Sequence, residues 1–295
     1  MKVVLQWIVA AISALTPLAA SAHSFQGLRR SAHAVDLKQQ ADRDFAFAAL
    51  RQSLAAKSHE AIKSLAVDDP RAFGFAIQLD AWPRSASLRV CFYPDPRFKW
   101  FEGARAIVMR LYAETLANTT LTATDVGFCA YNAGDIRIKF RNPDDDWSEV
   151  GKTGSLAAKP GEPTMGLASL AGDGPTPDSL GLTRHEILHS LGFQHEHQRP
   201  DVDCDFRPAR VVARFLGWPI AAVRDNFDRI DPKSVCKASL GACAILQSFD
   251  RKSVMLYQLE PKFFREGRDS ACYIDKQNND LSELDIKTLE ALYPK

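Results

Sequence analysis

This sequence has no excess of charge of either sign. Its 37 lysines and arginines nearly balance its 36 aspartates and glutamates, so the formal net charge of the 295 residues is +1. Without a positive surplus, the composition gives no electrostatic footprint for nucleic acid or for an anionic membrane surface. After residue 20 there is no apolar run long enough to span a bilayer, and there is no internal repeat. We therefore expect one large domain or two lobes, with no nucleic-acid partner.

Cysteine is sparse, and no two cysteines are spaced as Cys-x-x-Cys, so the sequence indicates neither a zinc ribbon nor a redox motif. The count of six is even, which suits an oxidising compartment where up to three disulfides form in one of many possible pairings. We expect Cys91 to pair with Cys129 and the other four cysteines to pair within the C-terminal half. Those four are Cys204, Cys236, Cys243 and Cys272.

The N-terminus has the layout of a secretory signal. Lys2 supplies a positive start, residues 3–20 are mostly apolar, and Ala20-Ser21-Ala22 offers small residues at the cleavage offsets. The alternative is a membrane anchor, but Gln6 within the apolar run and the Ala-Ser-Ala ending argue against it. We expect residues 1–22 to be a signal peptide and the mature protein to be secreted or periplasmic, with no stable membrane insertion.

Residues 23–80 form a charged stretch with apolar residues at helical spacing, and Asp68-Asp69-Pro70 near its end is a helix stop. Its position between a signal peptide and the main domain is typical of an inhibitory pro-segment, which would make the protein a zymogen. A helical extension that stays attached is the alternative interpretation. Either interpretation leaves residues 81–295 as the main domain.

The first part of that domain alternates between helical and strand patterns. Residues 101–118 carry apolar side chains at helical spacing, and short apolar or alternating runs lie on both sides. A strand, a crossover helix and further strands imply a lobe with a twisted, mixed sheet. After a loop at 142–163, residues 164–170 are expected to be an edge strand that could hold an extended peptide. The earlier strands are expected over 88–92, 125–131 and 136–140.

Four of the seven histidines fall within residues 185–197. His185 and His189 are four residues apart, so on a helix they share a face and could bind one ion. Gly192 suits the end of that helix, because glycine takes the left-handed conformation at no steric cost. The chain can then turn and bring His195 to the same ion. Three imidazoles with one coordination position left open describe a catalytic zinc site.

Glu186 directly follows the first of these histidines. In His-Glu-x-x-His, a carboxylate at this position is placed to act as the general base beside the metal. The alternative is a polar helix end whose histidines are solvated or hydrogen-bonded. The motif with glycine and histidine at the further offsets arises by chance in roughly one chain in a hundred thousand of this length, so zinc is favoured.

The zinc motif and later segments of the chain resemble those of a known family. Residues 185–195 resemble the long zinc signature of the metzincin peptidases, and Met255 resembles their Met-turn. Among metzincins, the sequence is similar to the astacin family. The zinc motif continues over residues 195–203 as His-Glu-His-Gln-Arg-Pro-Asp-Val-Asp, and Tyr257 follows the methionine by two residues.

The C-terminal motifs Leu281-Ser282-x-x-Asp285-Ile286 and Leu292-Tyr293 also match astacins, and the resemblance covers about residues 80–295. Val202, in place of the family's usual arginine, and the cysteine layout depart from the pattern, which indicates a divergent branch. The resemblance implies an α+β, zincin-like metzincin fold. Its upper lobe would hold a twisted mixed sheet and two helices, and its irregular lower lobe would hold a C-terminal helix.

The resemblance also implies roles at the site. His185, His189 and His195 would bind one catalytic zinc ion. Glu186 would deprotonate the zinc-activated water and pass the proton to the departing amine. Tyr257 would act as a fifth ligand in the resting enzyme or would hydrogen-bond the tetrahedral oxyanion.

Three further residues would be structural at the site, and a fourth histidine would not bind the metal. Met255 would form an apolar floor beneath the ligands, Gly192 would end the helix, and Glu196 would be a buried partner near the mature N-terminus. His197 is expected to lie behind the ligands or at the surface.

The sequence thus predicts a secreted zinc-dependent endopeptidase acting on protein or peptide substrates. A secreted zinc-containing binding protein, an inactive protease homologue, is the alternative, although such a protein has no need of Glu186 as a base. A zinc hydrolase acting on a non-peptide bond is a third possibility, and the expected edge strand counts against it.

Overall fold

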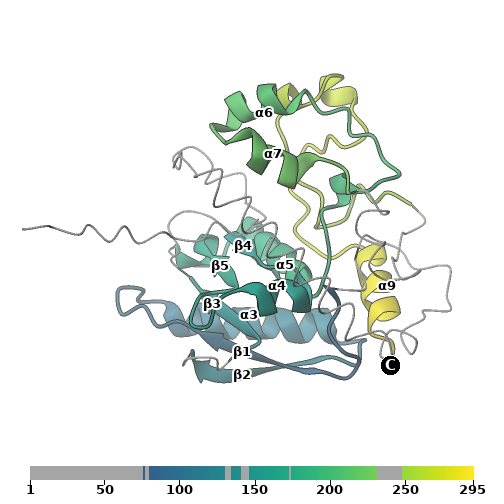
Figure 1. Ribbon diagram of the computed structural model, residues 1–295. Helices are drawn as coiled ribbons and strands as arrows, with labels where there is room; N and C mark the ends of the chain where they lie inside the picture. Colours follow the sequence, from purple (N-terminus) through teal and green to yellow (C-terminus); the bar gives the residue numbers. More distant parts are fainter. Residues whose placement is uncertain (1–75, 77–79, 130–133, 141–145, 173, 231–247) are drawn as a thin grey trace, which may run out of the picture.

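The computed structural model describes residues 76, 80–129, 134–140, 146–172, 174–230 and 248–295 (Figure 1). The predicted signal peptide, nearly all of the 23–80 segment, Cys236 and Cys243 lie outside these described residues. Ala76 and Asp80 are the exceptions within that segment; both are buried, and Ala76 is bridged in antiparallel fashion to Phe193. Within the described ranges, no helix combines the length and the apolar character needed to cross a membrane.

The first lobe is built on a five-stranded mixed sheet in the order β2-β1-β3-β5-β4. The strand β1 pairs in parallel with β2 and β3, β3 pairs in parallel with β5, and β4 runs antiparallel to β5. The predicted mixed sheet is therefore confirmed. Its strands are β1 (Ser87–Phe92), β2 (Thr122–Phe128), β3 (Ile136–Lys139), β4 (Asp146–Ser148) and β5 (Met165–Leu167).

The predicted edge strand over 164–170 is wrong in its position. Only Met165–Leu167 forms a strand, and it lies inside the sheet between β3 and β4. The edge strand is β4. Both β4 and the helix α4 (Gly151–Ala157) lie in residues 142–163, which the sequence predicts to be a loop. Three-residue strands show no hydrophobic period, so composition alone favoured a loop there.

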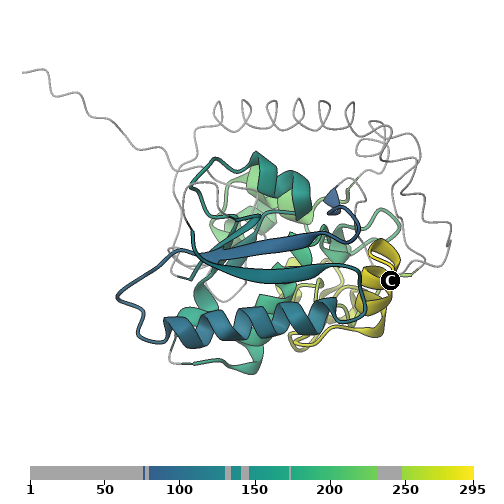
Figure 2. The same cartoon turned by 90° about the horizontal axis from the view of Figure 1, so that it is seen from below.

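Two long helices cover this sheet and contact each other: α3 (Phe101–Leu116) and α5 (Pro177–Ser190). Helix α3 runs alongside β1 and β2 (Figure 2), and its predicted apolar stripe is buried against them. The resulting core extends from strand residues such as Val90 to Met255 and Leu289 near the C-terminus. The C-terminal helix α9 (Glu283–Leu292) therefore packs against the first lobe rather than the second.

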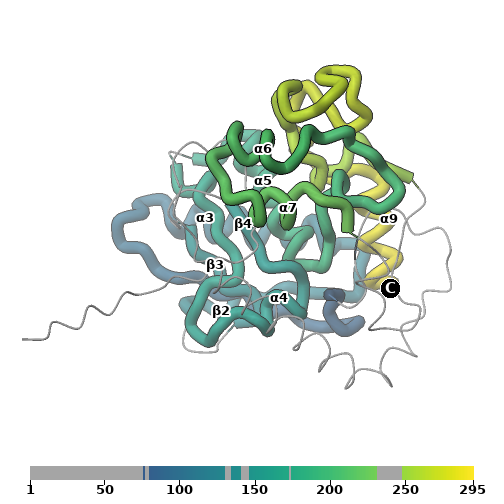
Figure 3. Tube along the Cα trace, turned by 45° about the horizontal axis from the view of Figure 1, so that its top comes forward, coloured from purple at the N-terminus to yellow at the C-terminus, as the bar shows by residue number. Residues whose placement is uncertain are grey.

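The second lobe holds α6 (Ala209–Leu216), α7 (Ile220–Phe227) and several short turns around a smaller core (Figures 1 and 3). Gly217, at a φ of 72°, ends α6 in the left-handed conformation, which glycine adopts at no steric cost. The disulfide Cys204–Cys272 ties the beginning of this lobe to its later part. The predicted disulfide Cys91–Cys129 in the first lobe is confirmed.

Helix α5 begins with a side-chain cap, and its last turn is bonded to distant parts of the chain. Thr176 caps it through a capping box with Ser179, and Pro177 lies in its first turn. At the other end, its last carbonyl oxygens accept hydrogen bonds from Trp82 Nε1 at 2.8 Å and from the Tyr293 hydroxyl at 2.7 Å. These donors satisfy carbonyls that a helix end leaves unpaired.

Tyr293→Phe tests how much this end of α5 depends on the C-terminus. The hydroxyl also accepts the Trp82 backbone N–H at 3.2 Å, so its removal leaves two buried backbone groups without this partner. We expect the free energy of unfolding to fall by about 1–3 kcal/mol. Tyr93→Phe, which removes an exposed hydroxyl bonded to the Gly161 carbonyl, is the control. Equal denaturant midpoints for the two variants would contradict the expectation.

Candidate metal centre

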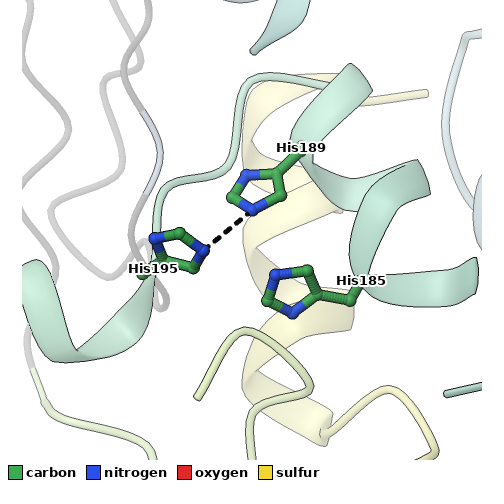
Figure 4. A group of neighbouring side chains, drawn as sticks. All are labelled: His185, His189 and His195. Carbon is green, nitrogen blue, oxygen red and sulfur yellow. Dashed lines mark hydrogen bonds between the residues drawn. The ribbon is translucent and has the colours of Figure 1, made fainter. Parts of the chain in front are cut away.

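The structure brings together the three histidines that the sequence predicts as ligands. His185 and His189 lie one turn apart on α5, and Gly192, at a φ of 99°, turns the chain where the helix ends. A Cβ atom at Gly192 would also lie only 3.3 Å from the backbone carbonyl carbon of Asp80, a close contact. The chain then returns with His195, and one ring nitrogen of each histidine lies within 4.8 Å of the others (Figure 4).

The other ring nitrogen of each ligand is held by an oxygen atom, which fixes the tautomer. An oxygen that only accepts hydrogen bonds requires a proton on Nδ1, so in all three rings Nε2 carries the free lone pair. Each of the three Nδ1···O distances is 2.8 Å. The acceptors are the Val254 carbonyl for His185, the Phe193 carbonyl for His189 and the Gln198 side-chain oxygen for His195.

These lone pairs fit a cation. Nε2 of His189 and Nε2 of His195 are 3.1 Å apart, the dashed contact in Figure 4, although neither atom carries a proton to share. Two ligands about 2.0–2.1 Å from a tetrahedral zinc ion would be about 3.3 Å apart. Nε2 of His185 is buried and has no hydrogen-bond partner among the described residues. The site residues therefore suit zinc.

Burial also argues against a solvated helix end. The exposed fractions of His185, His189 and His195 are 2%, 1% and 4%. Burial lowers the pKa of His185 to about 4 and lowers the pKa values of the other two rings as well. All three imidazoles are thus neutral at neutral pH, the state in which histidine binds a metal.

The residues expected around the ligands also lie at the site. Glu186 follows His185 on α5 and is buried. The Tyr257 ring lies 4.3 Å from the His195 ring and 5.6 Å from the His185 ring, centroid to centroid. Met255 is buried in the core of the first lobe, and its carbonyl oxygen accepts the Glu196 backbone N–H at 3.0 Å.

The turn that contains Met255 is held by a residue whose role the sequence did not reveal. The Asp285 carboxylate accepts the Ser253 hydroxyl at 2.7 Å and the Val254 backbone N–H at 3.1 Å. It also accepts the Ser282 N–H at 3.0 Å, closing the capping box of α9. Because the Val254 carbonyl accepts the His185 Nδ1–H, Asp285 is connected to the first ligand through a single residue, Val254.

Glu196 is buried against a cation. Its Oε1 lies 3.3 Å from Arg199 Nη1 and accepts the Asp250 backbone N–H at 2.9 Å. Arg199 is itself fully buried and also forms two hydrogen bonds with the Asp201 carboxylate. Burial raises the pKa of Glu196 to about 8, while the Arg199 guanidinium opposes that rise. The matched motif residues Glu196, Arg199 and Asp201 thus form a hydrogen-bonded polar network that follows the third ligand in the chain.

His197 is not part of the metal group, as expected, but it is not at the surface either. Its exposed fraction is 1%, and its ring stacks on the His195 ring at 4.9 Å. Its Nε2 donates to the Asn226 carbonyl oxygen at 2.8 Å. The side chain therefore packs behind the third ligand.

Comparison with known proteins decides the family. Residues 117–294 match the model of the peptidase family Astacin. The chain belongs to the astacin family. The predicted metzincin fold is likewise confirmed: the solved structure of myroilysin superimposes with a TM-score of 0.59 at 21% identity. That superposition covers 75% of this chain and 99% of myroilysin.

Two curated relatives show how far the sequence similarity extends. Zinc metalloproteinase nas-14 of Caenorhabditis elegans is 27% identical over 228 residues, 72% of this chain and 40% of the relative. High choriolytic enzyme 1 of Oryzias latipes is 30% identical over 121 residues, 38% of each chain. This astacin-family chain thus matches about two fifths of the length of these relatives.

Proposed function

We propose that this protein is an exported zinc endopeptidase that hydrolyses peptide bonds, with Glu186 as the general base. The observation that carries the proposal is the convergence of three buried Nε2 lone pairs, with Glu186 buried directly after the first ligand on the same helix. Membership of the astacin family and the names of the two curated relatives support the same chemistry.

His185, His189 and His195 would hold one zinc ion and leave a coordination position open for the reactants. When bound, zinc polarises the scissile carbonyl and lowers the pKa of a water molecule towards 7. The Val254 and Phe193 carbonyls and the Gln198 side chain keep the three rings directed at a common point.

Glu186 would take the proton of the attacking water and pass it to the departing amine. Glu186 directly follows His185 on α5 and has an exposed fraction of 1%, and this position would keep its carboxylate within reach of the attacking water. Tyr257 would donate its hydroxyl proton to the oxyanion that forms at the scissile carbonyl. Met255 would pack beneath the ligands as an apolar floor.

The two disulfides support export. Cys91–Cys129 and Cys204–Cys272 persist in an oxidising compartment, such as the cell exterior or the periplasm. We propose that residues 1–22 direct export and are then removed. Residues 23–80 would act as an inhibitory pro-segment, which mass spectrometry of the exported protein would test by locating the mature N-terminus.

Removal of the metal tests the whole proposal. We expect the purified mature protein to cleave denatured casein, to lose this activity with a zinc chelator, and to regain it with about one zinc ion per chain. Elemental analysis of the active protein measures the stoichiometry. A protein that holds zinc but leaves casein and peptide libraries intact would support the binding-protein alternative, and chelator-insensitive cleavage would refute the zinc mechanism.

Tyr257→Phe tests the oxyanion role. We expect kcat on a peptide substrate to fall by about 10²-fold with little change in KM, because the lost hydrogen bond forms only in the transition state. Zinc content should stay at the wild-type level. Tyr273→Phe is the matched control, because Tyr273 belongs to the same lobe and its ring packs edge to face with Phe264. A normal kcat for the Tyr257 variant would exclude this role.

A further inference from the structure

The third ligand is held differently from the other two. His185 and His189 lie on a helix, whereas His195 has an extended backbone, with φ at −65° and ψ at 137°. The Nδ1 atoms of the first two rings are bound by main-chain carbonyls, but that of His195 is bound by the side chain of Gln198. The orientation of the His195 imidazole thus depends on one side-chain carboxamide, that of Gln198, which a point mutation can remove.

Helix α7 fixes the orientation of that carboxamide. Gln198 Nε2 donates to the carbonyl oxygens of Asp225 at 2.9 Å and Asp228 at 3.3 Å. A flipped amide would turn its oxygen towards these two carbonyls and its NH₂ group towards the His195 N–H. Both contacts would then be repulsive, so the network assigns the oxygen to His195.

The carbonyl oxygens of Asp225 and Asp228 can accept hydrogen bonds from Gln198 because α7 ends at these residues. Asp225 is in its last turn and Asp228 is its C-cap residue, so their carbonyls are not paired by a continuing helix. The backbone of Gln198 is held at the same place, because its carbonyl oxygen accepts the Ile230 N–H at 2.8 Å. The side chain has an exposed fraction of only 4%. Water therefore has little access to replace its hydrogen bonds.

We infer that Gln198 is a positioning residue for the third zinc ligand, holding His195 as its Nδ1–H tautomer and linking the metal site to the C-terminal end of α7. This inference rests on the zinc site of the proposed function but not on its peptidase activity. The residue would touch neither the metal nor the substrate. It acts by keeping the lone pair of His195 Nε2 directed at the ion.

Two variants separate this role from simple docking of α7. Gln198→Glu and Gln198→Met both lose the Nε2 donors to α7, but only glutamate keeps an oxygen that can accept the His195 Nδ1–H. We expect the zinc Kd, measured against a chelating indicator, to rise by about 10–100-fold in Gln198→Met. In Gln198→Glu it should stay within about threefold of the wild-type value, since the acceptor is retained.

Thr183→Val is the control, because it removes a buried hydrogen bond within α5, from the Thr183 hydroxyl to the Ser179 carbonyl, without changing a ligand. Its zinc Kd and the visible spectrum of its cobalt-substituted form should match the wild type, whereas the cobalt spectrum of Gln198→Met should change. Equal zinc affinities in the methionine and glutamate variants would overturn the inference. All these readouts remain valid if the zinc-loaded protein cleaves no peptide.

A measurement on the unaltered protein covers the case in which a variant does not fold. Long-range ¹H–¹⁵N NMR of the zinc-loaded chain should show a slowly exchanging proton on Nδ1 of His195. In Gln198→Glu this proton should move downfield, because a carboxylate accepts a stronger hydrogen bond than an amide. An unprotonated Nδ1 in the wild-type chain would refute the assignment directly.

Discussion

Replacing Glu186 with glutamine is expected to lower kcat by about 10²–10⁴-fold, the range that a general base contributes. Glutamine has nearly the same shape but does not accept the proton of the attacking water. The zinc ligands, including neighbouring His185, keep their carbonyl and amide partners. We therefore expect zinc content, KM and the free energy of unfolding to stay close to the wild-type values.

The measurement combines steady-state cleavage of a peptide substrate with elemental analysis of the same samples. Glu283→Gln, an exposed position in the first turn of α9, is the matched control and should be fully active. Undiminished cleavage by the Glu186 variant would refute its role as the base. Loss of zinc together with activity would instead show that Glu186 maintains the site rather than performing the proton transfer.

The ligand set was predictable because its information is local. The spacing of His185 and His189 specifies one helical face, and Gly192 specifies where that helix ends. Both follow from backbone geometry over fewer than three turns. The third ligand then follows from the short return of the chain, so no distant contact is needed to recognise the site.

The supports of the site were not predictable for the opposite reason. Gln198 binds carbonyls on α7, and Asp285 binds the turn before Met255 from a helix more than 25 residues away in sequence. Hydrogen bonds to main-chain groups place no demand on the partner's residue type, so no pattern marks them in advance. The short strand β4 was missed because three residues show no period.

Asp285→Ala is expected to lower the free energy of unfolding by about 3–5 kcal/mol, a large effect for a single substitution. The carboxylate is buried and accepts three donors, the Ser253 hydroxyl and the N–H groups of Val254 and Ser282. Alanine accepts none of them, so the turn and the start of α9 are released together. Urea unfolding of the zinc-free protein measures the loss.

The same substitution should also weaken zinc binding, by about tenfold, because Asp285 holds the N–H of Val254, the residue whose carbonyl orients His185. Asp285→Asn, which keeps one acceptor oxygen, should fall between alanine and wild type in both measurements. Asp280→Ala, at a side chain 88% exposed, should change stability by no more than about 0.5 kcal/mol. A destabilised Asp285→Ala variant that bound zinc as tightly as the wild type would refute the link from α9 to the first ligand. In that case the carboxylate would stabilise the fold without orienting His185.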